Sequence, residues 1–370
     1  MPIFDALFYA FIVVVVIQII YYLFIFGKFS FHKTQGQTPK NFPVSVIICA
    51  KNEAKNLKKF LPSILEQDYP KFEVVLINDG STDKTLKVME AFKKDHENIK
   101  IVDVKNIEAF WGNKKYALTL GIKASTHSVL LFTDADCKPL SNQWIREMSS
   151  HFTNSKSIVL GYGGYAKIKG SFVNKLIRFE TLMTAVQYFS YAIMGHPYMA
   201  VGRNLAYRKE LFFEASGFIN HMKIKSGDDD LFVNQNANVE NTAICFSKES
   251  FTESIPKQKL SDWIEQKQRH ISTAKYYKFN HKVLLTLFYI SQLLFWVLAI
   301  VLLSSLTFWQ IVVGLVFTRF LVQYISLGYA SKKLNEFDLI LLLPFLEVFL
   351  ISMQFFIFIK NLISRPKHWK

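Results

Sequence analysis

The sequence predicts an α/β protein, in which a doubly wound sheet domain lies between membrane-spanning helices. Three observations support this fold class. In the middle of the chain, short apolar runs alternate with amphipathic stretches, which is the pattern of parallel β-α-β units. At both ends, apolar segments are long enough to cross a bilayer. Basic residues gather beside those segments, and this places the central domain on the cytoplasmic side of a membrane.

The first element is an apolar segment over residues 4–26, interrupted only by Asp5 and Gln18. Its length is that of a membrane-spanning helix. A secretory signal peptide is the alternative, but no basic region precedes the segment and no small-residue cleavage site follows it. We therefore expect a membrane anchor over residues 1–27 and a basic linker over 28–42.

The central region, residues 43–281, is expected to fold as one cytoplasmic domain of strands and helices. A strand from Val44 to Cys49 leads into an amphipathic helix, and a second strand ends at Ile77, before a helix from about Lys84. The further expected elements are a strand over 99–104, a helix over 114–124 and a strand that begins at Val129.

Acidic side chains follow three of these strands, and they predict a binding crevice. Glu53 follows the first strand, Asp79 the second, and Asp134 and Asp136 the strand "VLLFTD". Ligands of doubly wound sheets bind beyond the carboxyl ends of the strands, so these acids are expected to converge. Carboxylate oxygens suit a divalent cation that holds the phosphates of a substrate. Each acid taken alone is equally well a turn residue, and Lys114 is either a nucleotide contact or a solvated helix lysine.

The motifs that are missing exclude several classes of enzyme. No G-x-G-x-x-G follows the first strand and no G-x-x-x-x-G-K-[ST] occurs, which disfavours a dehydrogenase and a P-loop enzyme. A sugar nucleotidyltransferase needs a glycine-rich N-terminal loop, which "ICAKNEAKNL" does not supply. A transporter is disfavoured because most polar residues lie outside the apolar segments, and a non-catalytic scaffold because the strand-end acids are present.

The net charge of +15, from 44 Lys and Arg against 29 Asp and Glu, fits contact with membrane lipids. We expect no nucleic-acid partner, because no basic recognition helix or aromatic-basic repeat is present. The three cysteines, Cys49, Cys137 and Cys245, have no metal-binding spacing, and such a sparse set fits a reducing compartment.

Four motifs together resemble the family 2 glycosyltransferases of the GT-A fold. They are "CAKNEAKNL", "VVLINDGSTDKT", "GNKKYALTLG" and "LLFTDADC", in this order, and the similarity extends over about Val44 to Lys275. The resemblance implies a mixed, doubly wound sheet with a Rossmann-like nucleotide half. It also implies an inverting transferase that uses a nucleotide sugar, most often a UDP-sugar, with Mg²⁺ or Mn²⁺.

By position, the resemblance assigns residues to the donor. Asp134 and Asp136 match its D-x-D pair, with Asp136 as the direct metal ligand. Asn113 and Thr119 stand where the family has glycine and asparagine, which makes the contact of Lys114 less typical. The expected nucleotide-binding residues are Ala50, Glu53, Asp79, Lys114 and Asp134.

The segment "KSGDDDLFVNQ" resembles the catalytic-base motif of the family. One alignment makes Asp229 the base, beside Asp228, and a one-residue shift makes Asp230 the base. Repulsion among the three acids favours a raised pKa, which suits a base. The apolar residues that follow predict a buried helix start, whose dipole opposes this rise; a solvated loop is the alternative.

Two further segments resemble the acceptor side of the family. "QKQRH" places Gln266, Arg269 and His270 on a Q-x-x-R-W motif, with histidine in place of tryptophan, so a processive synthase remains an alternative to a single-transfer enzyme. Arg203 and Asn204 are expected to contact the acceptor or the diphosphate, and a structural role is nearly as well supported. Residues 171–200 are either an interfacial helix that meets a lipid-borne acceptor or a core helix.

The C-terminal region, residues 282–370, carries three apolar segments, over 283–303, 308–329 and 339–359. Arg319 lies in the middle of one segment, where a charge needs a partner, and we expect it to pair with Glu347 or a lipid phosphate. Both flanks of the last segment are basic, so we expect a re-entrant or interfacial course for it. The sequence thus predicts a multi-pass membrane enzyme of glycan biosynthesis that transfers sugar to a lipid-linked or growing-glycan acceptor.

Overall fold

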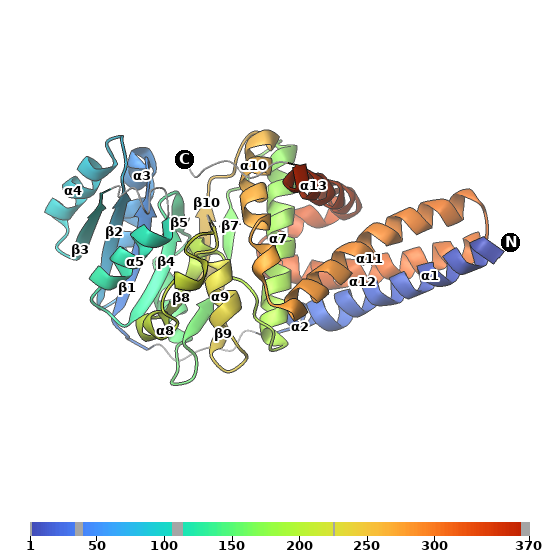
Figure 1. Cartoon of the computed structure of the whole chain (residues 1–370), viewed down its shortest axis with the longest axis horizontal. Coiled ribbons are helices and arrows are strands. Elements are labelled where there is room, and N and C mark those ends of the chain that lie inside the picture. The colour runs from blue at the N-terminus through green and yellow to red at the C-terminus, as the bar shows by residue number, and fades with distance from the viewer. Residues whose placement is uncertain (1, 34–39, 106–113, 225, 364–370) are drawn as a thin grey trace.

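The structure, a computed structural model, describes residues 2–33, 40–105, 114–224 and 226–363. A sheet domain forms one end of its long axis, and long apolar helices form the other (Figure 1). Asn113, at the glycine position of the third motif, and the basic tail beyond residue 363 lie outside the described residues.

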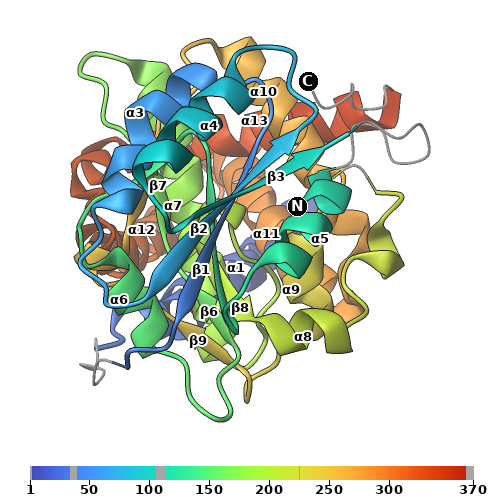
Figure 2. The same cartoon turned by 90° about the vertical axis from the view of Figure 1, so that its left-hand side faces the viewer.

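The main sheet has the order β3-β2-β1-β4-β8-β6-β9 within the described residues (Figure 2). Strands β1, β2, β3 and β4 are parallel, whereas β8 runs antiparallel to both β4 and β6. The predicted mixed, doubly wound sheet is therefore confirmed. Its strands are β1 Val44–Ala50, β2 Phe72–Asp79, β3 Ile99–Val104, β4 Val129–Asp134, β6 Ile158–Leu160, β8 Leu205–Arg208 and β9 Thr242–Ile244.

The central strands form because both of their faces are covered. Successive residues of β1 enter opposite cores: Val46 packs into a cluster with helices α3 and α4, and Ile47 into one with α5. This explains why the strands read as continuous apolar runs rather than as an alternating pattern. The helices that cover the sheet domain are α3 Ala54–Leu65, α4 Thr85–Asp95, α5 Lys114–Ala124, α6 Trp144–Ser150, α8 Lys209–Glu214, α9 Asp230–Asn236 and α10 Leu260–Ile271.

The strand order creates a switch point between β1 and β4. The chain runs outward from β1 to β2 and β3, and then returns to place β4 on the other side of β1. A crevice at the carboxyl ends of the strands is expected at such a point. A small second sheet continues beyond it, with the order β5-β10-β7; its strands are β5 Cys137–Pro139, β7 Gly163–Tyr165 and β10 Thr252–Ser254.

Helix α7, Phe172–Ile193, lies between the sheet domain and the apolar helices (Figure 1). Most of its side chains are buried, and Arg178 is only 3% exposed. Arg178 donates to Glu336, with 2.8 Å between Nε and Oε2, and its Nη2 lies 2.6 Å from Oδ1 of Asp338. The burial of α7 favours the core-helix alternative for this part of 171–200, and contact of the helix with a membrane interface stays a prediction.

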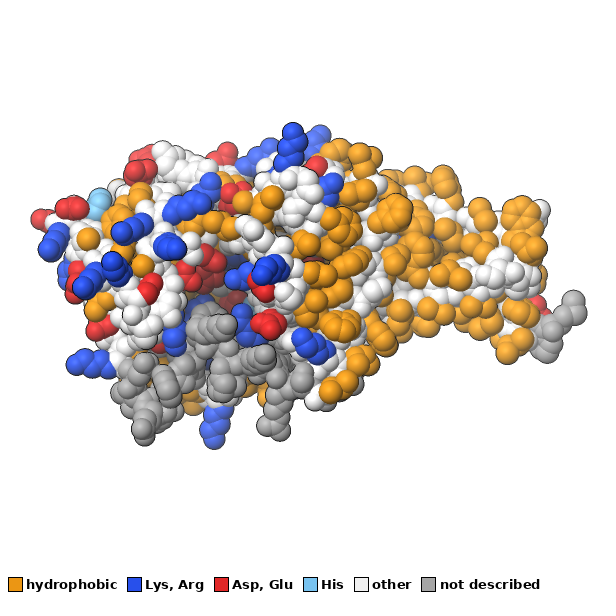
Figure 3. Space-filling view, turned by 90° about the horizontal axis from the view of Figure 1, so that it is seen from above, with side chains coloured by type: hydrophobic (Ala, Val, Ile, Leu, Met, Phe, Trp, Pro, Cys, Tyr) orange, Lys and Arg blue, Asp and Glu red, His pale blue; other side chains and the backbone are white. Residues whose placement is uncertain are grey.

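Four helical segments are long and apolar enough to cross a membrane among the described residues: Ile3–Ser30, Phe279–Ser304, Trp309–Lys333 and Phe337–Asn361. Their apolar side chains cover the surface at that end of the molecule (Figure 3). Helices α1, α11 and α12 run along the long axis, whereas α13 is seen nearly end-on and so lies across them (Figure 1). The helices are α1 Pro2–Ile19, continued by a π-helical turn Ile20–Ile25 and α2 Phe26–Ser30, then α11 Phe279–Ser304, α12 Trp309–Lys333 and α13 Leu343–Ile363.

The predicted pair of Arg319 and Glu347 is confirmed. Nη1 of Arg319 lies 2.9 Å from Oε2 of Glu347, and the two residues are 0% and 2% exposed. Gln323 and Gln18 also accept hydrogen bonds from Arg319, at 2.5 and 3.0 Å. This network joins α12 and α13 to α1, and it satisfies charges that are costly inside a bilayer.

Candidate active site

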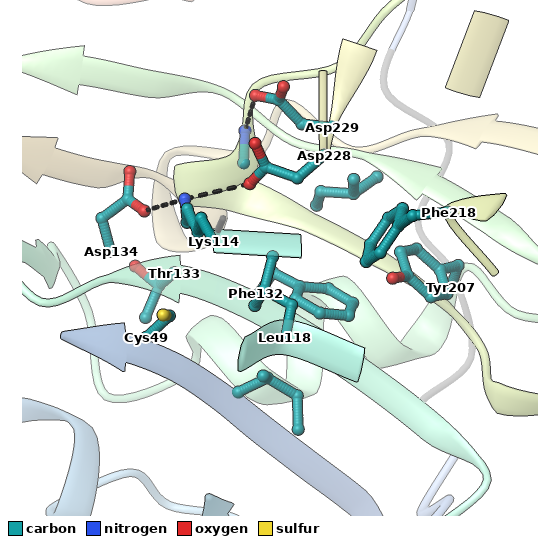
Figure 4. Close-up of a pocket in the computed structure, with 13 residues that line it drawn as sticks. Cys49, Lys114, Leu118, Phe132, Thr133, Asp134, Tyr207, Phe218, Asp228 and Asp229 are labelled. Carbon is teal, nitrogen blue, oxygen red and sulfur yellow. Dashed lines mark hydrogen bonds and ion pairs between the residues drawn. The ribbon is translucent and has the colours of Figure 1, made fainter. Parts of the chain in front are cut away.

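A pocket opens at the carboxyl ends of β1 and β4, at the switch point of the sheet (Figure 4). Cys49 from β1, Asp134 from β4 and Lys114 from α5 line one side of it, and Asp228 and Asp229 line the other. The deeper wall is apolar, and its residues are Ile47, Leu118, Phe132, Leu205, Tyr207 and Phe218. Of the four strand-end acids that the sequence expects to converge, Asp134 lines this pocket, beside Asp228 and Asp229, whereas Glu53, Asp79 and Asp136 lie outside its described lining.

Lys114 joins the two sides of this pocket (Figure 4). Its Nζ lies 3.2 Å from Oδ1 of Asp134 and 3.0 Å from Oδ2 of Asp228. Burial lowers the pKa of Lys114, but the carboxylates of Asp134 and Asp228 outweigh it and hold the pKa well above its usual range. The side chain is 17% exposed, so the alternative of a solvated helix lysine does not apply.

The residues that fit a divalent cation lie where β4 ends. The ligand atoms of Asp134, Asp136 and Cys137 all lie within 4.8 Å of one another. The Sγ of Cys137 lies 2.8 Å from Oγ of Ser254, and burial raises the pKa of this thiol well above its usual value. Burial thus favours the thiol form of Cys137, and its hydrogen-bonding partner is Ser254. The remaining carboxylate oxygens are the hard ligands that Mg²⁺ and Mn²⁺ prefer.

The proposed base lies at the N-terminal end of α9, as the sequence predicts for a buried helix start. Oδ2 of Asp229 accepts a hydrogen bond from the backbone N–H of Gly202 at 2.6 Å, and Oδ1 accepts one from the N–H of Asp230 at 2.8 Å. Burial, and then the charges of Asp228 and Asp230, raise the pKa of Asp229 to about 7. Gly227 precedes the acids with φ +100, and a side chain there would collide with Leu231.

Asp230 is turned away from the pocket. Its side chain is 7% exposed, and Oδ2 accepts hydrogen bonds from the hydroxyl of Tyr277, at 2.7 Å, and from that of Thr273. Successive residues of a helix point about 100° apart, so adjacent acids at a helix start cannot all face one ligand. The carboxylate of Asp230 is hydrogen-bonded to the segment that leads into α11, which favours Asp229 over the alternative in which a one-residue shift makes Asp230 the base; the choice between them stays a prediction.

The expected nucleoside side lies at the ends of β1 and β2. Asp79 is 4% exposed, burial raises its pKa, and its Oδ2 has no hydrogen-bond partner among the described residues. A buried carboxylate oxygen without a partner is costly, so a donor group from a ligand is expected there. Glu53 is half-buried and accepts from Nδ2 of Asn56 at 2.5 Å, while Ala50 is the buried last residue of β1.

The sequence of this site is similar to that of known proteins. Residues 45–215 match the family model Glycosyl transferase family 2. These residues form a family 2 glycosyltransferase domain. The matched segment carries the strand-end acids and Lys114, and it ends before Asp228 and Asp229.

Curated relatives match the glycosyltransferase domain over its first part. The poly-beta-1,6-N-acetyl-D-glucosamine synthase of Staphylococcus epidermidis is 35% identical over 121 residues, which are 32% of this chain and 28% of the synthase. Glycosyltransferase AglE of Haloferax volcanii is 36% identical over 104 residues, which are 28% of this chain and 33% of AglE. The chain thus spans about a third of the length of the curated relatives it matches.

A solved structure resembles almost the whole chain. It is the mannosyltransferase PcManGT from Pyrobaculum calidifontis, in complex with GDP-Man and Mn²⁺. The similarity covers 90% of this chain and 98% of that one, with a TM-score of 0.59 and 18% sequence identity. At this identity the likeness concerns the fold, and it supports the GT-A class for the glycosyltransferase domain.

The residues expected on the acceptor side of the glycosyltransferase domain have different surroundings. The guanidinium of Arg203 lies 4.2 Å from the centre of the Tyr165 ring. Burial and the charge of Asp134 raise the pKa of Asp136, and the positive charge of Arg203 opposes this rise. Arg203 therefore lies near the two aspartates proposed to hold the cation. Gln266, Arg269 and His270 lie on α10, and none of them lines the described pocket.

Asn204 has a structural role, which is the alternative that the sequence left open. Its side chain is 0% exposed. Its Oδ1 accepts from the indole of Trp144 at 3.0 Å, and its Nδ2 donates to the carbonyls of Tyr162 and Ser250 at 2.8 Å. Both N–H groups of the amide are taken up by protein carbonyls, which favours the structural role over a contact with an acceptor or a diphosphate.

Two residues of the site were not predicted from the sequence. Gly202 supplies the N–H that binds Asp229, and no local pattern indicates this contact. Lys115 is 1% exposed, and its Nζ donates to carbonyls of the loop before Asp228. A signal for Lys115 was present, because it shares the apolar face of α5 with Leu118 and Ile122 at i+3 and i+7 spacing.

Proposed function

We propose that the chain is an inverting glycosyltransferase that moves a sugar from a nucleotide-sugar donor to a lipid-linked or growing-glycan acceptor at the cytoplasmic face of a membrane. The observation that carries this proposal is the contact of Lys114 with both Asp134 and Asp228, at 3.2 and 3.0 Å, beside Asp229. It brings the carboxylates suited to a cation and the carboxylate suited to a base to one pocket.

The donor would occupy the ends of β1, β2 and β4. In this proposal Asp79, Glu53 and Ala50 bind the nucleoside, and Asp134 and Asp136 hold Mg²⁺ or Mn²⁺. A bound cation would stabilise the negative charge that develops on the leaving diphosphate. The complex of PcManGT with GDP-Man and Mn²⁺ supports this division. The resemblance of the motifs favours a UDP-sugar as the donor of this chain.

The transfer step would use Asp229 as the general base. The acceptor hydroxyl oxygen attacks the anomeric carbon, the bond to the diphosphate breaks, and the hydroxyl proton moves to Asp229. Because attack comes from the face opposite the leaving group, the anomeric configuration inverts. A pKa of about 7 suits this work, since a base is most effective when its pKa lies near the operating pH.

The acceptor is proposed to be membrane-borne because a soluble acceptor gives no reason for the apolar helices. Basic residues beside these helices favour a cytoplasmic domain, with α11 crossing outward and α12 returning. The loop "SKKLNEFD" and the basic tail would then both lie on the cytoplasmic side, which one full crossing by the last segment does not allow. The transverse course of α13 supports an interfacial or re-entrant last segment instead (Figure 1).

A processive polysaccharide synthase is the second candidate, and the similarity to the Staphylococcus epidermidis synthase favours it. His270 stands at the tryptophan of the processive motif, which favours transfer of a single sugar. The length of the product, measured by mass spectrometry on a defined lipid acceptor, separates the two.

The experiment that tests the proposal is nucleotide release by the detergent-solubilised full chain. UDP-sugars and GDP-mannose are supplied in turn, with Mg²⁺, with Mn²⁺ and with excess EDTA. We expect release with one donor, stimulation by the metal, and loss of sugar transfer in Asp229→Asn. Absence of release from every nucleotide sugar in the presence of membrane lipids would contradict the proposal.

A further inference from the structure

Lys115 is a buried lysine whose ammonium group binds three backbone carbonyls. Its Nζ donates to the carbonyl oxygen of His221 at 2.9 Å, and to those of Ile224 and Ser226 at 2.6 Å each. The side chain is 1% exposed. The three acceptors lie in the segment between α8 and α9, which contains a 3-10 turn, Ile219–His221, and we call it the base loop; a single side chain thus fixes three points of its backbone.

This loop leads directly into the proposed base. Ser226 is followed by Gly227, whose φ is +100, and then by Asp228 and Asp229. Phe218, at the other end of the loop, lines the pocket. The position of the loop therefore affects Phe218 in the apolar wall of the pocket and the place of its two acids.

Burying a lysine at this position would cost free energy if its side chain only filled space. Leu118 and Ile122, on the same face of α5, are 5% and 0% exposed, and a leucine or methionine at 115 would continue that apolar face. Burying an ammonium group requires acceptors for all its protons. The three carbonyls supply them, and the nearby charges of Asp228, Asp230 and Asp229 oppose the fall in the pKa of Lys115 that burial causes, to about 8.

The neighbour of Lys115 in the sequence faces the other way. Lys114 contacts Asp134 and Asp228 in the pocket, while Lys115 contacts the loop behind Asp228. The first turn of α5 thus holds the base segment from two sides, one through the side chain of Asp228 and the other through the backbone that precedes it.

We propose that Lys115 is a positioning residue for the base: by binding the carbonyls of His221, Ile224 and Ser226 it sets where Asp228 and Asp229 stand relative to Lys114 and Asp134. The inference rests on the proposed function, because it assigns Lys115 to the base step of that reaction. It predicts that loss of the ammonium group affects transfer more than donor binding.

The test compares Lys115→Met with Lys115→Arg in the full-length protein in detergent. Lys123→Met is the matched control, since Lys123 is an exposed lysine on the same helix. For Lys115→Met we expect kcat to fall at least about tenfold, while the affinity for the donor, measured by calorimetry, stays within about threefold. Lys115→Arg keeps the charge and the donors, so it should retain more of kcat than Lys115→Met, and Lys123→Met should match the wild type.

Hydrogen exchange gives a readout that does not depend on sugar transfer. In Lys115→Met, amides of residues 219–231 should exchange faster, whereas those of β1 and β4 should not change. If the wild type transfers no sugar, the proposed function fails, yet this exchange result still decides whether Lys115 holds the loop.

Three results would overturn the inference. They are an unchanged kcat in Lys115→Met, an equal loss of kcat and donor affinity, and faster exchange throughout the domain, which would indicate general destabilisation. If Lys115→Met does not fold, Lys115→Gln takes its place, and the same results support or contradict the positioning role.

Discussion

The carboxylate of Asp229 accepts a hydrogen bond from the backbone N–H of Gly202, with 2.6 Å between the nitrogen and Oδ2. A Cβ atom at position 202 would lie 3.2 Å from the same oxygen, which is tighter than an ordinary contact. Gly202 therefore binds the proposed base and leaves room for it, and a side chain at this position has to displace Asp229.

Gly202→Ala should lower the transfer rate by about tenfold or more, because small displacements of a catalytic group are costly. Donor affinity should remain close to that of the wild type, since Gly202 contacts the proposed base rather than the strand-end acids. Gly314→Ala is the control, because nothing lies within 4 Å of a Cβ built there. Equal rates for the wild type and Gly202→Ala would show that the contact between Gly202 and Asp229 does not matter to the reaction.

The pH dependence of kcat/KM should report the free Asp229. Its pKa is raised to about 7, and only the deprotonated carboxylate accepts the hydroxyl proton. The rate should therefore be constant above about pH 8 and fall by about tenfold per unit below about pH 6. Measurement of initial rates across this range checks the prediction. A profile that stays flat down to about pH 5 would exclude a base with this pKa.

Asp229→Asn keeps the shape of the side chain and removes the proton acceptor. We expect the transfer rate to fall by roughly 10² to 10⁴, the usual contribution of a general base. Calorimetry should find donor affinity within a few-fold, because the base acts mainly in the transition state. Asp95→Asn, at an exposed position at the end of α4, should behave as the wild type. Normal transfer by Asp229→Asn would refute the assignment.

Asp136→Asn should affect donor binding, in contrast to Asp229→Asn, which should affect the transfer step. The change removes a carboxylate from the cluster with Asp134, so donor binding and stimulation by metal should be lost together. Titration with Mn²⁺, followed by donor calorimetry, measures both. Full activity of the wild-type protein in excess EDTA would contradict a metal-dependent mechanism.

Breaking the pair of Arg319 and Glu347 should destabilise the apolar helices. Arg319→Leu leaves Glu347 buried without its cation, a change that typically costs about 3–5 kcal/mol. The double change to methionine at both positions should recover most of this loss. Thermal unfolding in detergent measures the effect, and Thr318→Ala, at an exposed position of the same helix, is the control. Unchanged stability and activity in Arg319→Leu would mean that the network is dispensable.

Much of the nucleotide half was predictable because its signals are local. Strands β2 and β4 are apolar runs that end in aspartate, and β1 is followed by polar residues. The rule that ligands bind at the carboxyl ends of such strands brings Asp134 to the pocket. The pairing of Arg319 with Glu347 was also predictable, because two opposite charges within apolar segments have few other partners.

The remainder depends on contacts between distant parts of the chain. The loop that binds Lys115 lies far along the sequence, at residues 221–226, and its acceptors are backbone carbonyls that carry no sequence signal. The direction of Asp230 depends on hydroxyls of Thr273 and Tyr277. The burial of α7 depends on Glu336 and on Asp338, which follow another helix. Such partners become visible only when the elements are placed in space.

The pairing of Arg319 on α12 with Glu347 on α13 has a consequence for how the protein is made. Arg319 leaves the ribosome before Glu347, and an isolated arginine at the centre of a membrane helix costs about 2.5–3.5 kcal/mol to insert. If α12 enters a bilayer before α13 is made, Gln18 and Gln323 can bind Arg319, but its counter-ion Glu347 arrives only with α13. We therefore expect insertion of α12 to depend on synthesis of α13, because a chain that ends before residue 347 lacks the counter-ion of Arg319.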